Sequence, residues 1–220
     1  MQLELTAADG HKFAAYRANA NGEAKGGVVI IQEIFGVNSH IRSVCDRYAA
    51  KGYTAIAPAL FDRVSPDIQL GYEPDDIAKG REVRGKVGDD DALKDIKAAI
   101  DTLTAEGLSC AVVGYCWGGS LAWLTATRID GTKGAVSYYG GQVPDQSDEQ
   151  PKVPVIFHFG ETDASIPMDK VDIVSKQHPD LPLYVYPAGH GFSCDARGSY
   201  DKQCADLAFE RTLEFLGTHI

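Results

Sequence analysis

A short segment in the middle of the chain, Gly114-Tyr115-Cys116-Trp117-Gly118, most constrains how this protein can fold. It follows the apolar run 111–113 and precedes a helix-like stretch, 120–127. The segment therefore predicts a buried strand, a sharp turn and a helix in immediate succession. Glycines around such a turn permit strained backbone and close approach of the helix. Cys116 then lies at the strand end, where the N-terminus of the helix favours its thiolate form.

Apolar strands and amphipathic helices alternate along the rest of the chain. An antiparallel hairpin is predicted around Asp9-Gly10, from strands 2–6 and 12–17. Further strands are predicted at 27–31, 53–57, 134–139, 153–159 and 183–186, and helices at 39–50, 76–86, 89–107, 168–177 and 201–216. This order predicts an α/β fold whose mostly parallel central sheet carries helices on both faces. Within it, G-x-C-x-G is a cysteine version of the G-x-S-x-G nucleophile elbow, which predicts the α/β-hydrolase fold.

Composition limits the classes of partner. The chain has 220 residues, of which 44% are hydrophobic, so we expect one domain over residues 1–220. A net charge of −10 disfavours binding to nucleic acid or to an anionic membrane. No apolar run approaches the ~18 residues that span a bilayer, and the first residues lack the pattern of a signal peptide. We expect a monomer that acts on a small molecule.

The cysteines indicate a reducing compartment. Their number is odd and no C-x-x-C occurs, so neither a disulfide framework nor a zinc ribbon is predicted; they are Cys45, Cys110, Cys116, Cys194 and Cys204. A thiol enzyme needs such conditions, and we expect a cytoplasmic protein.

Two residues late in the chain could complete a catalytic triad with Cys116. Asp163 follows the predicted strand 153–159, and His190 lies between glycines after the strand 183–186. Each has an alternative reading, Asp163 as a turn or capping residue and His190 as a surface loop residue. However, an α/β-hydrolase has its acid and then its histidine after the nucleophile in chain order. We therefore predict a Cys116-His190-Asp163 triad.

At this point the chain resembles the dienelactone hydrolases (carboxymethylenebutenolidases), a family of cysteine-using α/β-hydrolases. The resemblance spans nearly the whole chain, and its motifs are Gln32-Glu33-Ile34-Phe35-Gly36, Gly114-Tyr115-Cys116-Trp117-Gly118-Gly119, Tyr138-Tyr139-Gly140, Gly160-Glu161-Thr162-Asp163 and Ala188-Gly189-His190-Gly191-Phe192. It implies opening of the lactone ring of dienelactone to maleylacetate, a step in the degradation of chlorinated aromatics, through a thioester on the cysteine. It implies no metal and no organic cofactor.

The resemblance also implies roles for residues that spacing alone would not single out. Glu33, which by itself reads as a solvated or ion-paired carboxylate, matches a family glutamate that interacts with the cysteine and takes its proton when substrate arrives. A thiol that stays protonated until then is less exposed to oxidation. The backbone N–H groups of Trp117 and Ile34 are expected to form the oxyanion hole.

Substrate recognition is expected to involve arginine, because dienelactone carries a carboxylate. Arg81 lies where the family has its first such arginine, with Arg84 as the alternative. The family's second arginine falls four residues after the histidine, where this chain has Cys194, and Arg197 could substitute for it. Tyr138 is a candidate substrate contact at a strand end, although either it or Tyr139 could serve core packing.

Three other functions remain open at this stage. A broad carboxylesterase or thioesterase would use the same machinery on an unknown substrate. A hydrolase-like domain that only binds a small hydrophobic ligand would leave Cys116 inert. A redox sensor would instead pair Cys116 with Cys194, which otherwise reads as an incidental loop cysteine.

Overall fold

Eight strands form one sheet in the computed structural model, which describes all residues from Met1 to Ile220. The strands are β1 (Gln2–Thr6), β2 (Lys12–Ala18), β3 (Gly26–Ile31), β4 (Tyr53–Pro58), β5 (Cys110–Tyr115), β6 (Ala135–Tyr138), β7 (Val155–Gly160) and β8 (Leu183–Tyr186). Their order across the sheet is β1-β2-β4-β3-β5-β6-β7-β8. The pairs β1·β2 and β2·β4 are antiparallel, and all pairs from β4 to β8 are parallel. The predicted mostly parallel sheet is confirmed.

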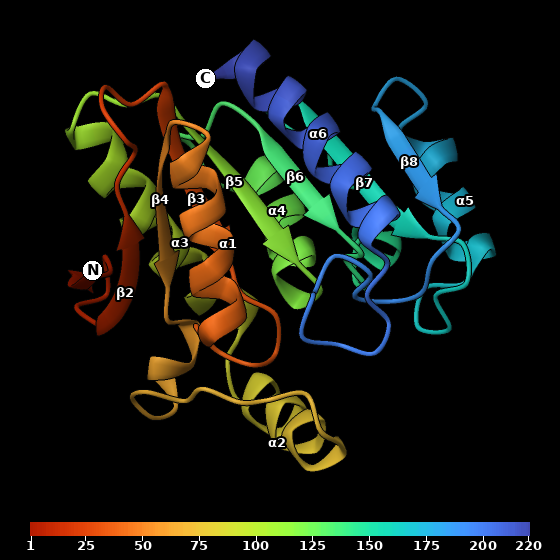
Figure 1. The fold of residues 1–220 in the computed structure, drawn as a ribbon, viewed down its shortest axis with the longest axis horizontal. Helices are drawn as coiled ribbons and strands as arrows, with labels where there is room; N and C mark the ends of the chain where they lie inside the picture. Colours follow the sequence, from red (N-terminus) through yellow and green to blue (C-terminus); the bar gives the residue numbers. More distant parts are fainter.

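Helices cover both faces of this sheet, as expected for an α/β-hydrolase (Figure 1). They are α1 (Ser39–Ala50), α2 (Pro74–Arg84), α3 (Asp89–Ala105), α4 (Trp117–Arg128), α5 (Met168–Gln177) and α6 (Lys202–His219), with short 3-10 turns η1 (Leu60–Arg63) and η2 (Pro144–Gln146). In Figure 1, α1 and α6 lie in front of the sheet and α3 and α4 behind it, while α2 stands apart below. None of these helices combines the length and apolar character needed to cross a bilayer.

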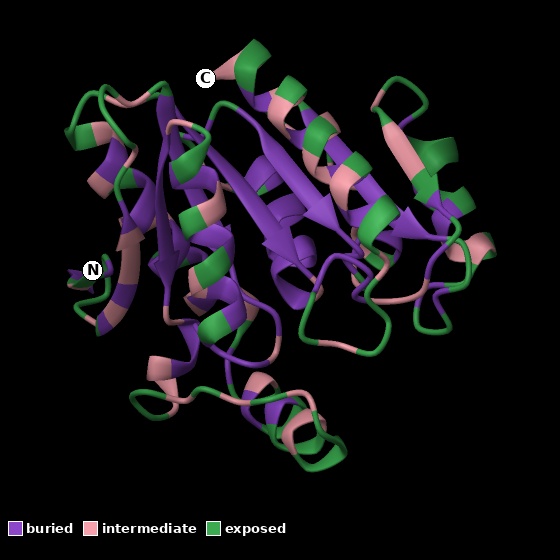
Figure 2. Ribbon diagram, in the orientation of Figure 1, coloured by how far each residue is buried: buried purple, intermediate pink, exposed green.

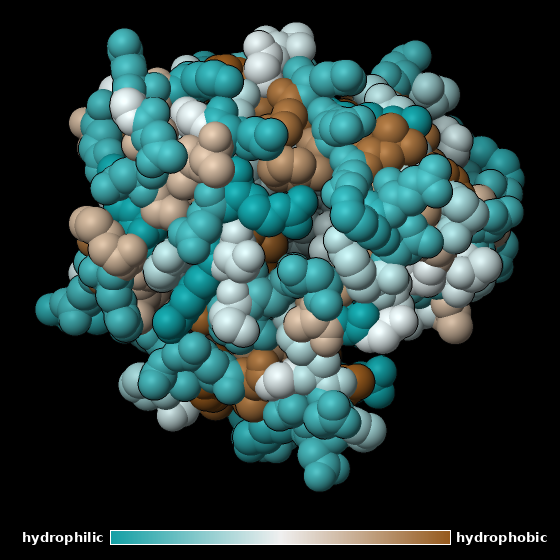
Figure 3. All heavy atoms as spheres, viewed as in Figure 1, coloured by the Kyte–Doolittle hydropathy of each residue, from teal (hydrophilic) through white to brown (hydrophobic).

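Burial follows the pattern expected for a sheet covered on both sides. Every residue of β3, β4, β5, β6 and β7 is buried, whereas β1 and β2 alternate in exposure (Figure 2). Parallel strands flanked by helices therefore read as continuous apolar runs in the sequence. On the face drawn in Figure 3, hydrophilic side chains predominate and apolar ones gather in separate patches.

The predicted elements are all present, with shifts at their ends. The helix predicted at 76–86 begins earlier, at Pro74, because proline suits the first turn and Glu73 and Asp76 form a capping box. The helix after the elbow begins directly at Trp117, three residues before the predicted stretch. Asn38 caps α1 by accepting from the Ile41 N–H at 3.2 Å.

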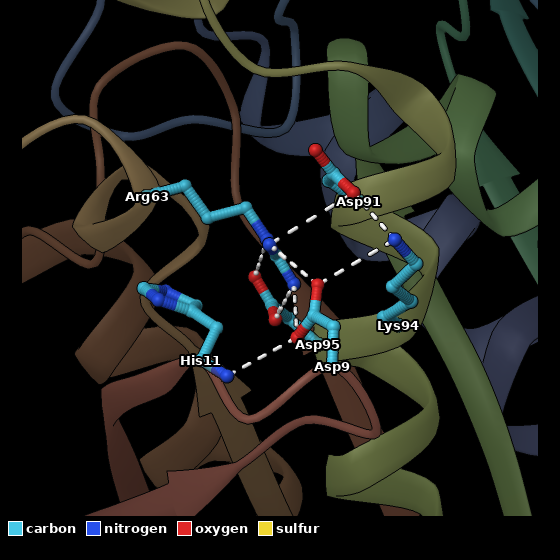
Figure 4. A network of polar contacts seen from close by, with 6 residues as sticks. All are labelled: Asp9, His11, Arg63, Asp91, Lys94 and Asp95. Atoms are coloured by element: carbon cyan, nitrogen blue, oxygen red, sulfur yellow. Dashed lines mark hydrogen bonds and ion pairs between the residues drawn. The ribbon is translucent and has the colours of Figure 1, made fainter.

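A polar network ties η1 to α3 and to the first hairpin (Figure 4). The Arg63 guanidinium donates two hydrogen bonds to the fully buried Asp95, at 2.8 and 2.7 Å. It also pairs with Asp9 at 3.0 Å, and Lys94 pairs with Asp91 at 2.7 Å. Burial raises the pKa of the Asp95 carboxyl, while Arg63 opposes that rise. The network therefore holds the segment after β4 against the face of α3.

A core histidine makes the stability of this fold depend on pH. His158 of β7 is fully buried, with its ring bonded to the Tyr186 hydroxyl at 2.8 Å and to the Thr212 hydroxyl at 3.2 Å. Burial and the nearby Arg211 charge lower its pKa to about 3. The unfolded chain binds a proton there near pH 6.5, so between that pH and about 3 the unfolded state holds more protons than the folded one.

Folding stability is therefore expected to fall as pH decreases below about 6.5, by up to about 1.4 kcal/mol per pH unit from this one group. Urea unfolding at a series of pH values measures the slope, and the variant His158→Gln should show a shallower acid limb. Equal slopes in both proteins would assign the acid sensitivity to other groups.

Candidate active site

Cys116 occupies a strained turn between β5 and α4. Its backbone has φ 56° and ψ −117°, in the left-handed range that residues with side chains rarely adopt. The neighbouring glycines explain why the turn is possible. A Cβ on Gly114 would collide with the Gly118 carbonyl oxygen, and one on Gly118 with the carbonyl oxygen of Ile31 in β3. The predicted elbow is present, and its glycines are required by close backbone contacts.

The structure brings together the three residues predicted as a triad. His190 Nε2 lies 3.2 Å from Cys116 Sγ, and His190 Nδ1 lies 2.7 Å from Asp163 Oδ2. The second carboxylate oxygen of Asp163 accepts the backbone N–H groups of Ser165 at 2.8 Å and Ile166 at 3.2 Å. Asp163 follows β7 and His190 follows β8, so parallel neighbouring strands deliver both to the same edge of the sheet. This arrangement orients the imidazole with Nδ1–H toward Asp163 and Nε2 toward the sulfur.

The electrostatics of the three groups favour a charged imidazole. Burial lowers the pKa of His190, but negative charge at Cys116 and the hydrogen bond to Asp163 outweigh it and raise that pKa to about 10. Burial likewise opposes ionisation of Asp163, but His190 and the two backbone N–H groups lower its pKa overall. Asp163 thus stays a carboxylate, and His190 readily holds a proton whenever the sulfur is anionic.

Removing the sulfur should therefore change the titration of His190. Cys116 contributes the largest effect that raises the pKa of His190. The pKa of His190 should therefore be lower in the variant Cys116→Ser than in the parent protein. NMR titration of the imidazole resonances measures both values. The matched variant Cys110→Ser, at the far end of the same strand, should leave the pKa of His190 where it is. An unchanged pKa in Cys116→Ser would contradict the coupling.

Glu33 is completely buried beside the site and is engaged by other groups in this structure. Its Oε2 accepts from the Tyr72 hydroxyl at 3.4 Å, and its Oε1 lies 3.4 Å from the Arg197 guanidinium. No hydrogen bond joins it to Cys116. The interaction with the cysteine that the family resemblance implies is thus absent from this arrangement, in which Arg197 holds the carboxylate.

A cavity of about 540 Å³ opens over the sulfur. It is lined by Cys116 and His190 together with Ile34, Phe35, Ile77, Arg81, Arg84, Trp117, Ser120, Gly141, Gln142, Ser165 and Arg197. Trp117 begins α4, where its N–H has no acceptor within the helix, and the Ile34 N–H donates no hydrogen bond within the chain. Both residues predicted for the oxyanion hole therefore border the cavity, and the backbone N–H group of each has no acceptor within the chain.

The three arginines at this cavity differ in how far they are already committed. Arg84 bonds Gln142 at 2.9 Å and Asp89 at 3.2 Å, and its guanidinium lies over the Trp117 ring at 5.6 Å. Arg197 is held by Glu33. Arg81 is exposed and forms no ion pair, which leaves its charge available to a ligand. Arg81 and its alternative Arg84 thus both reach the cavity, and so does Arg197.

The expectation that Tyr138 contacts substrate is not supported by its position. Its side chain is buried in the core, its hydroxyl lies 2.7 Å from the Thr212 hydroxyl, and it does not line the cavity. The next residue, Tyr139, lies just beyond the end of β6 and is also buried. Tyr139 packs its ring against His190, at 5.1 Å between centroids, with a backbone φ of 39°.

Sequence reasoning missed Tyr72, which contacts Glu33 from the segment between η1 and α2, and Gln142, which bonds Arg84 in the cavity wall. Tyr72 lies outside any periodic pattern, so no signal in the sequence could have found it. Gln142 lies two residues after the Tyr138-Tyr139-Gly140 motif, and its proximity to that strand end was the available signal.

The fold, the strained cysteine and the cavity above it define an α/β-hydrolase. The chain belongs to the dienelactone hydrolase family, whose model matches residues 13–220. Among the curated relatives, it is 34% identical to a Synechocystis sp. protein named "Putative carboxymethylenebutenolidase", over 88% of this chain and 86% of that one. It is 29% identical to "Carboxymethylenebutenolidase 1" of Cupriavidus pinatubonensis, over 97% and 95% of the two chains. The crystal structure titled "Putative Dienelactone Hydrolase" from Klebsiella pneumoniae subsp. pneumoniae superimposes with a TM-score of 0.84 at 30% identity, covering 97% of this chain and 98% of that one.

Proposed function

We propose that this hydrolase cleaves a small anionic lactone or ester, such as dienelactone, with Cys116 as nucleophile and through a thioester intermediate. One observation carries the proposal. The His190 imidazole is bonded on one side to Cys116 and on the other to Asp163, at the floor of a cavity large enough for a small ester. A nucleophile, a base and a group that orients the base are the requirements for acyl transfer.

The thiol must first lose its proton. Glu33 and Arg197 suggest how binding could trigger this step, since Arg197 both lines the cavity and holds the Glu33 carboxylate. An anionic substrate that engages Arg197 releases Glu33, and the freed carboxylate takes the thiol proton, as the family resemblance implies for this residue. His190, at 3.2 Å from the sulfur, then pairs with the thiolate until it reacts.

The thiolate then attacks the ester carbonyl carbon and forms a C–S bond. The oxyanion of the tetrahedral intermediate accepts hydrogen bonds from the N–H groups of Trp117 and Ile34, each worth about 3 kcal/mol in comparable sites. Cleavage of the C–O bond releases an enolate or alkoxide, which takes a proton, and leaves the thioester. His190, oriented by Asp163, removes a proton from water, and the resulting attack frees the carboxylic acid and returns the thiol.

Local charge supports an anionic substrate. Three arginines face the cavity of a chain whose net charge is −10, and Arg81 has no internal partner there. Dienelactone carries a carboxylate, and the named carboxymethylenebutenolidases among the relatives fit that class of substrate. A broad carboxylesterase or thioesterase remains the second candidate, favoured by the open, only partly apolar cavity and by the absence of an arginine at position 194. We further propose that the protein is a monomer of the cytoplasm; the five free cysteines support a reducing compartment.

A substrate panel tests the proposal. Both dienelactone isomers, neutral aryl esters and acyl thioesters are compared by kcat/KM on the parent protein and on Cys116→Ser. The proposal requires turnover of a dienelactone well above that of neutral esters, and loss of turnover in the variant. Faster hydrolysis of neutral esters would favour the broad esterase, and no hydrolysis of any ester would overturn both candidates.

A further inference from the structure

Three buried side chains with different metal-binding groups converge beside the active site. The ligand atoms offered by Glu33, His40 and Cys194 all lie within 4.8 Å of one another. The three come from separate parts of the chain: the loop after β3, the first turn of α1 and the loop after His190. All three are buried, with His40 at 5% exposure and the other two at 0%. A buried carboxylate, imidazole and thiol gathered in this way form an unusual core cluster.

The imidazole of His40 is held in the orientation that metal-binding histidines adopt. Its Nδ1 lies 2.9 Å from the carboxylate of Asp195, the residue after Cys194. Its other nitrogen, Nε2, is buried and has no hydrogen-bond partner. Histidines that bind a metal typically donate one ring N–H to a carboxylate and so leave the lone pair of the other nitrogen free. A buried polar atom without a partner is costly, and this one calls for an occupant.

We infer that Glu33, His40 and Cys194 form a binding site for a borderline divalent cation of the Zn²⁺ class. A thiolate, an imidazole and a carboxylate are all common zinc ligands, and water completes a tetrahedron. Binding forms three protein–metal bonds and displaces the Cys194 thiol proton to solvent, with no change of oxidation state. The two anionic ligands balance the charge of the ion, and Arg197 must give up its contact with Glu33.

Occupation of this site inhibits the enzyme, because the metal takes the carboxylate on which activation of Cys116 depends. This consequence rests on the proposed function, whereas the binding itself does not. Cys194 stands where the family pattern has an arginine, so this chain has a soft ligand in place of a positive charge there. Metal binding at this buried site therefore regulates ester hydrolysis by withdrawing Glu33 from the activation of Cys116.

A direct binding experiment tests the site. Cys116 and His190 could themselves hold zinc, so all measurements start from Cys116→Ser, in which that pair is broken. The chelator-treated protein is titrated with Zn²⁺ against a chromophoric chelator, and with Co²⁺ to detect thiolate-to-metal charge-transfer absorption. We expect one equivalent to bind and the absorption band to appear. Added Cys194→Ser should weaken binding at least about tenfold and abolish the band, and added Asp195→Ala should weaken binding about 10–100-fold.

The matched control Cys204→Ser removes another buried thiol, at the start of α6, and should leave affinity and band unchanged. His40→Gln serves as a second test should Cys194→Ser fail to fold. Absence of binding in Cys116→Ser, or full affinity after loss of Cys194 or His40, overturns the inference. Inhibition of the parent enzyme by Zn²⁺, relieved by Cys194→Ser, is measured separately, so a failed hydrolase assay leaves the binding result standing.

Discussion

Replacing Cys116 with alanine is expected to lower kcat/KM for ester hydrolysis by at least about 10⁴-fold, because the triad acts as a unit and no other group can form the acyl intermediate. His190 would keep its bond to Asp163 but lose its 3.2 Å contact with the sulfur. Steady-state kinetics on the preferred substrate of the panel measures the loss, with quenched-flow detection of the thioester in the parent protein as a second readout.

The fold should survive this change. Cys116 faces the cavity and is partly exposed, so removal of its sulfur leaves little void in the core. Alanine also keeps a Cβ, and the strained backbone at φ 56° is supported by the surrounding contacts in both proteins.

The matched control is Cys110→Ala, at the other end of β5 and about 20 Å away at the rise of a strand. It should cost some stability through the lost core volume but retain turnover. Full esterase activity in Cys116→Ala would show that Cys116 is not the nucleophile and that its thiol has only a structural role.

Much of this site could be predicted from the sequence because parallel strands end at one edge. Cys116 and Asp163 follow the buried strands β5 and β7, and His190 follows the partly exposed strand β8 of the same sheet. Once the alternation of strands and helices is recognised, the topology brings the three strand ends together without knowledge of any loop. The glycines of the elbow were readable for the same reason, since they mark positions where backbone meets backbone.

The rest of the site depends on loop paths and side-chain directions, which carry no periodic signal. Tyr138 ends β6 with its hydroxyl beside Thr212 in the core, whereas Tyr139, the residue after the strand, packs on His190. The loop after His190 delivers Arg197 to Glu33, and Cys194 to the neighbourhood of His40. Spacing identifies Arg197 as a candidate to replace the missing arginine. It could not indicate that this guanidinium already holds the buried glutamate.

Replacing Arg63 with alanine is expected to destabilise the fold by about 3–5 kcal/mol, because it leaves the buried Asp95 carboxylate without its partner. Asp95 is fully buried on α3, and the two Arg63 hydrogen bonds at 2.8 and 2.7 Å are what offset its desolvation (Figure 4). Chemical denaturation measures the free energy of unfolding. Lys94→Ala breaks exposed pairs of the same network, at Asp91 and Asp9, and should change stability by at most about 1 kcal/mol.

The double variant Arg63→Met/Asp95→Leu separates loss of the ion pair from loss of packing. Because an apolar pair leaves no charge to desolvate, it should recover most of the stability that Arg63→Ala loses. Arg63 ends η1, in which the Phe61 ring stacks on Trp117 at 5.8 Å between centroids. Arg63→Ala should therefore also reduce kcat, through loosened support for the first residue of α4, and the double variant should restore it together with the stability. If Arg63→Ala lost no more free energy of unfolding than Lys94→Ala does, solvent would reach Asp95 and the ion pair would not be needed for stability.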